Sequence, residues 1–377
     1  MSAQEKKDLL VMKFLHYFIT KKNYNPVVVH GIQNEIWLEN LNNDIKLVRL
    51  VLGYVHNEEQ LEFDLFKNKR LTRQIRFKTL SFDMKVVTFY LDINEDIKIN
   101  QLKKYFFVNA SKESFLKKDL VVKKYFPDMV DNLKFTEEGS KLFEKINSDI
   151  LKKNLDETEK LNELFTPNKP IITYGLIGII LLFFISMYIL GNGSEDIETL
   201  YKFGALVKDN SIIRILSSIF LHIGIIHLIM NVWALKLLGE QTEKFYGHIK
   251  MLFIFLYSGI IGNLASIILM NDNTISAGAS GAIFGLMGAI LYFSLNQRTY
   301  MSEALRKEIL PVIIANILLG FMISSINMYA HIGGLIGGML ISNALGIKYR
   351  TSRFEKTNGI ICSVVLITIL IYIAYFI

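Results

Sequence analysis

The chain has very little cysteine and proline: its 377 residues include one cysteine, Cys362, and five prolines. A single cysteine excludes an intramolecular disulfide and a cysteine-based metal site. Because isoleucine, valine and leucine surround Cys362, we expect it to act as a small apolar side chain. The N-terminal stretch also lacks the uninterrupted apolar segment of a secretory signal, since charged residues recur from Glu5 to Lys13. We therefore expect the first part of the chain to remain in the cytosol.

Long apolar runs are absent from residues 1–165 and dominate residues 171–377. We expect a soluble N-terminal domain over 1–165, a linker over 166–170 that contains Pro167 and Pro170, and a membrane domain over 171–377. The membrane domain is expected to cross the bilayer seven times, because it holds seven apolar runs of spanning or nearly spanning length. The expected spans cover residues 171–190, 213–238, 251–270, 280–295, 309–325, 330–345 and 360–377.

The formal net charge is +7, which by itself permits nucleic-acid binding. The basic residues instead gather in alternate loops between the spans, as in the cytosolic loops of membrane proteins, so we expect no nucleic-acid partner. They are Lys236, Lys244, Lys250, Arg298, Arg306, Lys307, Lys348, Arg350, Arg353 and Lys356. The first loop is acidic and carries Glu195, Asp196, Glu198 and Asp209. We expect a multi-pass protein of the plasma membrane with a cytosolic N-terminus and an external C-terminus.

The patterns in residues 1–165 predict a small α/β domain. Helices are expected over 5–21 and 58–79, strands over 27–30, 35–39, 45–54 and 86–91, and more helix over 100–165. The last helix is expected to follow Thr136 as its N-cap, with Leu142, Ile146 and Ile150 on its apolar face. The order of elements loosely resembles restriction-endonuclease-like folds. The aspartate and Glu-x-Lys pattern of those nucleases is absent, so nuclease chemistry is unsupported.

The role of this first domain stays open. His16, His30 and His56 lie among many carboxylates, which is compatible with a metal or ligand sensor. No metal-ligand spacing relates them, which favours ordinary surface or core histidines. An unidentified ligand or protein partner of residues 1–165 remains an alternative.

Ser280 lies in the stretch Gly278-Ala279-Ser280-Gly281, at the start of an apolar run that continues to Leu295. A helix over this run is about 24 Å long at 1.5 Å per residue, which is shorter than the hydrocarbon core of about 30 Å. We therefore expect Ser280 to lie below the membrane surface, in a pocket that opens toward the outer side. The polar stretch 271–274 before it requires a water-filled cavity or packed protein at this depth, so a wet pocket is predicted.

Polar residues also interrupt the second and sixth spans. His227 and Asn231 are four residues apart and share a helical face. In the sixth span, Gly334 and Gly338 lie on the side of His331 and allow the helix of the serine to approach closely. Each feature alone has an ordinary explanation, because small-residue runs usually pack helices and a membrane histidine is often a structural hydrogen bonder. Together they fit the nucleophile, base and oxyanion roles of acyl transfer.

These motifs resemble those of the rhomboid family of intramembrane serine proteases. The resemblance covers residues 171–377, and three ordered motifs on different spans make it specific. The motifs are His222-x4-His227-x3-Asn231, Gly278-Ala279-Ser280-Gly281 and Ala330-His331-x-x-Gly334. The resemblance implies a rhomboid-like core of six helices plus a seventh, C-terminal span.

The resemblance also implies an activity, that of a serine endopeptidase cleaving transmembrane segments of membrane proteins within the lipid bilayer. Ser280 and His331 would form a catalytic dyad that needs neither a metal nor a cofactor. The oxyanion would be bound by His227, Asn231 and the backbone N–H of Ser280, while His222 would shape the cavity.

Further residues of the motifs would support this site. Phe284 stands where family members often carry tyrosine, and it would stack on the imidazole of the base. Gly278, Gly281 and Gly334 would allow the close contacts that hold this ring. Arg214 fits the arginine of a family Trp-Arg pair whose tryptophan is replaced by an isoleucine here, and Glu243 matches a glutamate that supports structure.

Two other classes of function are alternatives. A histidine-lined transporter would carry internal repeats, and the halves of residues 171–377 show none. A client-binding adaptor that does not cut, as in pseudoproteases, would have lost the serine or the histidine, and both are present. Protease activity is therefore the preferred prediction.

Overall fold

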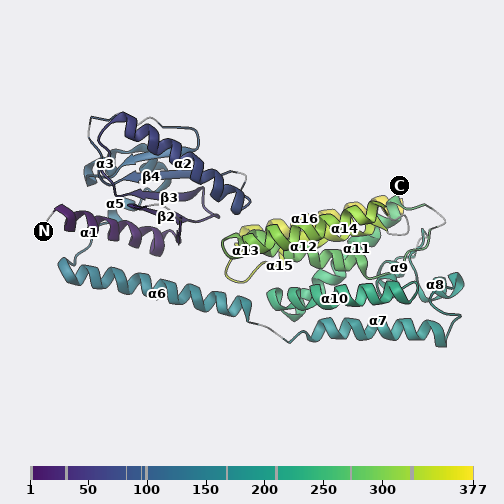
Figure 1. Ribbon diagram of the computed structural model, residues 1–377. Coiled ribbons are helices and arrows are strands. Elements are labelled where there is room, and N and C mark those ends of the chain that lie inside the picture. The colour runs from purple at the N-terminus through teal and green to yellow at the C-terminus, as the bar shows by residue number, and fades with distance from the viewer. Residues whose placement is uncertain are drawn as a thin grey trace. The chain divides into compact units, whose positions relative to one another are not determined.

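The computed structural model describes residues 3–376 except 30–32, 82, 95, 98–100, 167–168, 209–210, 272–273 and 323–326. The chain divides into two compact units, Met1–Glu159 and Lys160–Ile377 (Figure 1). Some predicted positions lie outside the described residues: His30, Pro167, Asp209, part of the polar stretch at 272–273, and the ends of the fifth and seventh spans at 323–325 and 377.

The first unit is built on a five-stranded sheet in the order β1-β2-β3-β4-β5. The strands are β1 Asn25–Val27, β2 Glu35–Glu39, β3 Ile45–Val51, β4 Lys85–Tyr90 and β5 Tyr105–Asn109. Strands β1 to β3 form an antiparallel meander, whereas β3, β4 and β5 are parallel. The parallel pairing of β3 with β4 requires a crossover, and helix α2 (Glu58–Lys78) supplies it.

Helices cover both faces of this sheet. Along β4, Val87 and Phe89 contribute to the core that includes α1, whereas Val86 and Tyr90 face the side of α2. Figure 1 shows α1 and α2 on opposite faces. The helices of this part are α1 Ala3–His16 with a π-helical continuation Tyr17–Lys21, α2, α3 Glu113–Lys118, α4 Leu120–Tyr125, α5 Met129–Asn132 and α6 Gly139–Phe165.

The predicted helix over 58–79 and the strand over 35–39 agree with α2 and β2. Three predictions were wrong in detail. The first strand lies at Asn25–Val27 rather than 27–30, and β5 lies in a stretch predicted as helix. Its aromatic and β-branched sequence, YFFVN, favours a strand once β4 offers a parallel edge. Helix α6 begins at Gly139, and the hydroxyl of Thr136 donates to Glu137 instead of capping it.

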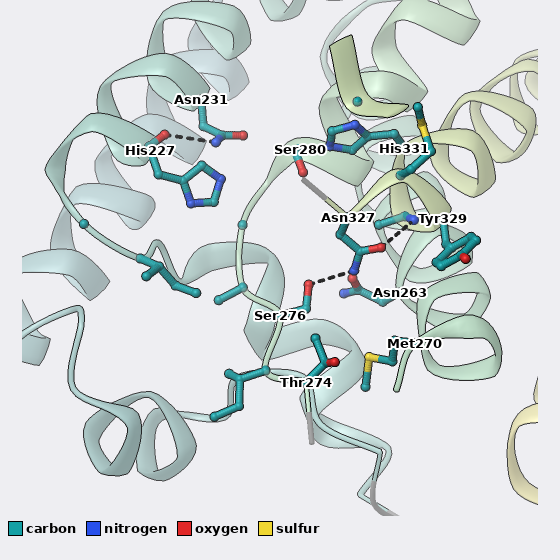
Figure 2. Close-up of a pocket in the computed structure, with 18 of the residues that line it drawn as sticks. His227, Asn231, Asn263, Met270, Thr274, Ser276, Ser280, Asn327, Tyr329 and His331 are labelled. Carbon is teal, nitrogen blue, oxygen red and sulfur yellow. Dashed lines mark hydrogen bonds between the residues drawn. The ribbon is translucent and has the colours of Figure 1, made fainter. Parts of the chain in front are cut away.

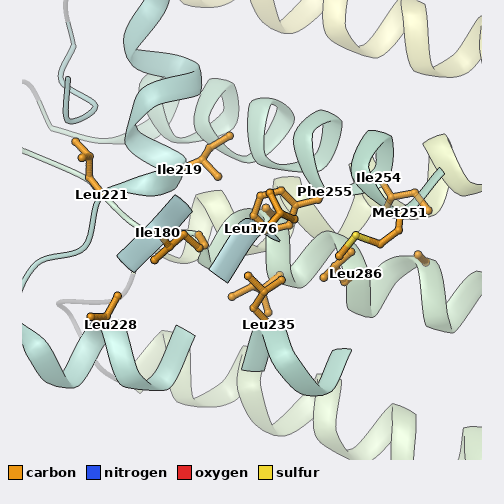
Figure 3. Packing of buried hydrophobic residues seen from close by; sticks show 14 of the residues in the cluster. Leu176, Ile180, Ile219, Leu221, Leu228, Leu235, Met251, Ile254, Phe255 and Leu286 are labelled. Atoms are coloured by element: carbon orange, nitrogen blue, oxygen red, sulfur yellow. The ribbon is translucent and has the colours of Figure 1, made fainter. Parts of the chain in front are cut away.

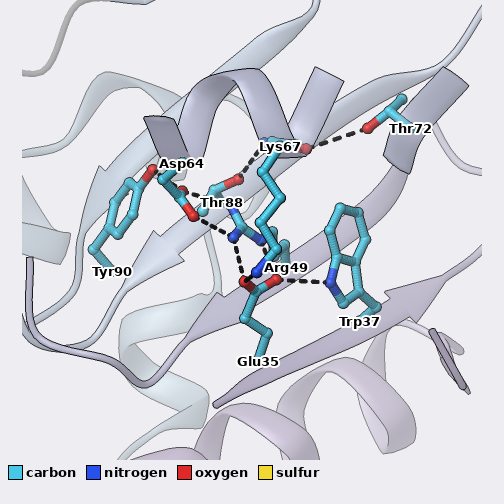
Figure 4. A network of polar contacts seen from close by, with 9 residues as sticks. Glu35, Trp37, Arg49, Asp64, Lys67, Thr72, Thr88 and Tyr90 are labelled. Atoms are coloured by element: carbon cyan, nitrogen blue, oxygen red, sulfur yellow. Dashed lines mark hydrogen bonds and ion pairs between the residues drawn. The ribbon is translucent and has the colours of Figure 1, made fainter. Parts of the chain in front are cut away.

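A buried ionic network ties α2 to the sheet (Figure 4). The Arg49 side chain is fully buried and donates to Glu35 and, through two nitrogens, to Asp64 at 2.6 and 2.5 Å. Tyr90 also donates to Asp64, at 2.8 Å. Burial by itself would raise the pKa of Glu35, but the hydrogen bonds and charges of Arg49 and Lys67 hold it below its usual value. The network therefore depends on every one of its charges being paired.

The second unit is helical. Its helices are α7 Ile171–Ile189, α8 Ile197–Phe203, α9 Ile213–Ser217 with the 3-10 turn Ser218–Phe220, α10 Ile225–Tyr246, α11 His248–Leu269, α12 Ser280–Asn296, α13 Arg298–Ala304 with a π-helical turn Leu305–Ile309, α14 Leu310–Met322, α15 Met328–Leu345 and α16 Arg353–Phe376. Among the described residues, α7, α11, α15 and α16 are long and apolar enough to span a membrane, and the bent pair of α9 and α10 is a fifth candidate. Helix α12 is apolar but shorter.

The second predicted span is not one continuous helix. The segment Ile213–Phe220 meets α10 at an angle of 91°. Gly224 precedes α10 with φ +76°, a conformation that side chains other than glycine rarely adopt, so the chain turns there. Other boundaries also differ: α11 begins at His248 rather than 251, α15 at Met328 rather than 330, and α16 at Arg353 rather than 360.

The core of the second unit is formed by apolar side chains from α7, α10, α11 and α12. Figure 3 shows part of it, with Leu176 and Ile180 of α7 near Leu235 of α10 and Phe255 of α11. Glycines let the backbones of α11, α12 and α15 approach one another closely. A Cβ added at Gly334 or Gly338 of α15 would overlap backbone carbonyls of α12. The predicted close approach of the His331 and Ser280 helices is thereby confirmed.

The last turn of α6 also belongs to the second unit. Leu164 is buried in its core, and the ring of Phe165 packs edge-on against Phe293 at 6.0 Å between centroids. Glu163 pairs with Lys348 after α15. These three residues thus pack within the second unit, ahead of the predicted linker.

Candidate active site

A cavity of about 960 Å³ lies among the ends of α10, α11, α12, α14 and α15. Four predicted site residues line it together: His227, Asn231, Ser280 and His331. Figure 2 shows their side chains converging on this space from three helices. Gly278 also lines the cavity.

Ser280 is the first residue of α12, and the loop before it is held by backbone hydrogen bonds. Ser276 exchanges two such bonds with Leu206, at 2.8 and 2.9 Å. The N–H of Gly278 donates to the carbonyl of Ser218 at 3.0 Å. These contacts place the serine at a helix N-terminus, where backbone N–H groups lack intrahelical acceptors and favour negative charge.

His331 lies in the first turn of α15 and is 8% exposed. Its ring stacks on Phe284 of α12, with centroids 4.1 Å apart and planes inclined by 13°. Within the described part of the chain its Nδ1 has no hydrogen-bond partner. Packing, rather than a carboxylate, therefore orients this imidazole.

His227 and Asn231 are one turn apart on α10. The amide nitrogen of Asn231 donates to the carbonyl of His227 at 3.0 Å, which uses one of its two hydrogens and leaves the other for a ligand. Gly278 has φ +150°, and a Cβ there would lie 2.8 Å from the His227 ring. Glycine at this position thus keeps the imidazole close to residues 274–279, the loop before Ser280, which we call the serine loop.

The chain is similar in sequence to a known protein family. Residues 209–348 match the Rhomboid domain family model. Over 148 residues the chain is 34% identical to the putative rhomboid protease YdcA of Bacillus subtilis (strain 168), covering 73% of that protein and 39% of this chain. This chain belongs to the rhomboid family.

Two further relatives of this rhomboid are matched over a smaller share of their length. This chain is 40% identical over 219 residues to the rhomboid protease GluP of Bacillus subtilis (strain 168). The match covers 56% of this chain and 42% of that protein. It is 35% identical over 157 residues to RHOMBOID-like protein 7 of Arabidopsis thaliana, covering 41% of this chain and 50% of that protein. The chain thus spans half or less of these two relatives. The family and the apolar helices support a multi-pass membrane protein.

The other predicted site residues lie behind or away from the cavity of this rhomboid. His222 accepts a hydrogen bond from the Ala279 N–H at 3.4 Å. It therefore supports the serine loop from outside the cavity lining. Glu243 is fully buried and accepts from the backbone of Ile172 and Thr173, both at 2.9 Å, and thereby holds the start of α7. This contact lies outside the cavity lining.

Arg214 also lies outside the cavity lining. Its guanidinium donates to the carbonyls of Tyr201 and Ala205, at 2.8 and 3.1 Å, and lies over the Tyr201 ring. Ala205 directly precedes Leu206, the partner of the serine loop. The arginine therefore orders the first loop, and a tyrosine supplies an aromatic contact beside it.

The sequence predictions did not include Asn327, which joins three elements (Figure 2). Its amide nitrogen donates to Ser266 of α11 at 2.5 Å and to Ser276 of the serine loop at 3.0 Å. Its oxygen accepts from the N–H of Ala330 at 3.2 Å and so caps α15. An asparagine three residues before Ala330 is a typical N-cap, and this signal was available in the sequence.

Within the described part of the chain, the side chains of Ser280 and His331 are not hydrogen-bonded to each other. In Figure 2 the side chains of Ser280 and His331 both lie at the cavity. Catalytic hydrogen bonds are often long in the absence of substrate and tighten in the reacting complex. The site combines a hydroxyl, an imidazole, an amide donor and a helix N-terminus around one cavity. This set of groups suits acyl transfer.

Proposed function

We propose that this protein is an intramembrane serine endopeptidase that uses a Ser280–His331 dyad. The observation that carries the proposal is the meeting of these two residues with His227 and Asn231 at one cavity. Membership of a family whose named members include proteases supports it.

In the proposed reaction, Oγ of Ser280 attacks the carbonyl carbon of the scissile peptide while His331 accepts the serine proton. The oxyanion receives hydrogen bonds from the backbone N–H of Ser280 and from the side chains of His227 and Asn231. Collapse of this intermediate breaks the C–N bond, and His331 returns the proton to the leaving amine. Water then hydrolyses the acyl ester, with His331 again acting as base.

Labelling with a serine-reactive fluorophosphonate tests the dyad in the full-length protein. The unmodified protein should be labelled, and Ser280→Ala and His331→Ala should not. Ser186→Ala is a matched control, because Ser186 lies on α7 and donates to a carbonyl of its own helix. Equal labelling of Ser280→Ala and the control would reject the nucleophile.

Turnover tests the oxyanion groups. Replacing His227 or Asn231 by alanine should lower turnover about 10²- to 10³-fold, the usual effect of losing one oxyanion donor. The reporter is a membrane-spanning substrate in proteoliposomes. Unchanged turnover in both variants would remove these residues from the mechanism.

We also infer the substrate class. A peptide bond within a stable transmembrane helix is shielded and hydrogen-bonded, so the segment must unwind before Ser280 reaches it. Substrates should therefore be single-span proteins with Gly, Pro or Asn in the outer part of the span and a small residue before the cut. Reporters in which these residues are replaced by leucine, and the small residue by phenylalanine, should be cut more slowly. Equal rates would reject this selection.

The orientation follows from the charges of the loops, with residues 1–165 and the N-terminus in the cytosol and the C-terminus outside the plasma membrane. Cysteines at two exposed positions test it in a Cys362→Ala background. Asn192→Cys should react with an impermeant reagent added outside cells, and Ser352→Cys only after the membrane is opened. The reverse pattern would invert the topology.

A further inference from the structure

Helix α2 of the first unit presents an exposed face that carries large aromatic side chains. Phe63, Phe66 and Phe77 are 71%, 66% and 67% exposed. They recur with Arg70 and Arg73 at spacings of three and four residues, so all five form one stripe along the helix. The opposite side of α2 packs on the sheet. Exposed phenylalanines in a regular stripe indicate a surface that meets an apolar phase.

The charge of this face is strongly positive. The acidic residues of α2 end at Asp64, and the remainder of the helix, to Lys78, holds six basic residues and no acidic one. Lys67 pairs with the buried Glu35. The other five are exposed, and no ion pair involving them is found within the described residues: Lys69, Arg70, Arg73, Arg76 and Lys78. They lie on and beside the phenylalanine stripe.

We propose that this face of α2 binds a bilayer surface rich in anionic phospholipid. The phenylalanines enter the boundary between headgroups and acyl chains, while the lysines and arginines contact lipid phosphates. Charge complementarity selects the anionic lipid. The same chain carries membrane-spanning helices, so a bilayer is always present at a high effective concentration.

A second basic surface in the same unit lacks the aromatic stripe. Residues 117–124 of α3 and α4 carry four lysines, but the exposed large apolar side chain among them is a single one, Leu120. Interfacial binding needs both apolar insertion and charge, since either alone gives weak association. This surface therefore serves as a control of equal charge change. None of the residues of either surface lines the cavity of the second unit, so the proposal stands apart from the proposed protease activity.

The test uses the full-length protein in proteoliposomes. Gln74, exposed beside the stripe, is replaced by cysteine in a Cys362→Ala background and carries an environment-sensitive fluorophore. Its emission should shift to the blue, and brominated lipid should quench it, in vesicles of equal parts phosphatidylcholine and phosphatidylglycerol but not in phosphatidylcholine alone. High salt should reverse the shift in the same sample, because at 1 M it screens charges beyond about 3 Å.

Substitutions on α2, and on α3 and α4 as a control, show which surface binds the lipid. Each basic residue near an anionic membrane strengthens binding about five-fold, so Arg70→Glu with Arg73→Glu should lower the ratio of bound to free domain at least about 25-fold. Phe63→Ser with Phe66→Ser should remove the quenching while leaving all charges in place. The control, Lys118→Glu with Lys123→Glu, should behave as the unmodified protein.

Several results would overturn the proposal. These are an equal shift in phosphatidylcholine alone, a shift that persists in 1 M salt, or loss of the shift in the α3–α4 control but not in the α2 variant. A shift that appears only on adding RNA or soluble cell protein would assign the face to a different partner. The salt titration needs no substitution in the stripe, so misfolding of a variant does not leave the result open.

Discussion

Replacing Gly262 by alanine tests whether the proposed base depends on close helix packing. Gly262 lies on α11, outside the cavity lining, and a Cβ added there would be 2.6 Å from the carbonyl oxygen of Ala330. Ordinary contacts of this kind begin at 3.4 Å, so the two backbones must separate by about 0.8 Å. The displaced carbonyl belongs to the residue directly before His331, so we expect the imidazole to move with it.

The magnitude follows from this displacement. A misplacement of about 1 Å in a catalytic group costs on the order of 10²-fold in rate, so turnover should fall about 10- to 100-fold. Overpacking should also destabilise the second unit by about 1–3 kcal/mol. Turnover of a membrane-spanning reporter and thermal unfolding are measured on the same proteoliposomes, to separate the loss of rate from the loss of fold.

Gly178→Ala on α7 is the matched control. A Cβ at this position meets nothing within 4 Å, and alanine favours a helix over glycine by about 1 kcal/mol. The control should keep full turnover and unfold no earlier than the unmodified protein. If Gly262→Ala retained full turnover, the contact between α11 and α15 would not position the base, and the reasoning would be refuted.

Four further predictions concern other parts of the chain. Asn327→Ala should lose an N-cap worth about 1 kcal/mol and the bonds to α11 and the serine loop, and should lower kcat with little change in KM; an unchanged kcat would contradict its positioning role. Arg49→Met should destabilise the first unit by about 3–5 kcal/mol in chemical unfolding, because Asp64 loses its cation and Glu35 keeps only Lys67. Since the pKa of Glu35 is lowered in the folded state, the stability it provides is present at neutral pH and should be lost as the pH falls below its usual value of 4.5; a flat profile would count against the network. A protein truncated to begin at Lys160 should keep its melting temperature, whereas one that begins at Thr166 should melt earlier because Leu164 and Phe165 leave the core; equal melting would show that this anchor is dispensable.

Local sequence patterns determined much of this protein. Apolar runs mark the membrane helices. Hydroxyl, imidazole and amide groups are costly in an apolar segment, so the sequence alone points to Ser280, His331, His227 and Asn231. Helix α2 was predicted nearly to the residue. Its start has Asn57 as N-cap with acidic residues in the first turn, and these signals act within a few residues of one another.

Only the tertiary structure decided features that depend on contacts between distant segments. The bend before α10, the strand β5, the anchoring of α6 in the second unit and the bonds of Asn327 each require a partner far away in sequence. Burial inside a folded unit supplies such partners, and no local pattern encodes which of them will meet. The contacts of the predicted residues were decided in the same way. His222 and Glu243 belong to the sequence pattern, but their hydrogen bonds direct them to the serine loop and to the start of α7, because a buried polar group lies where its partners are.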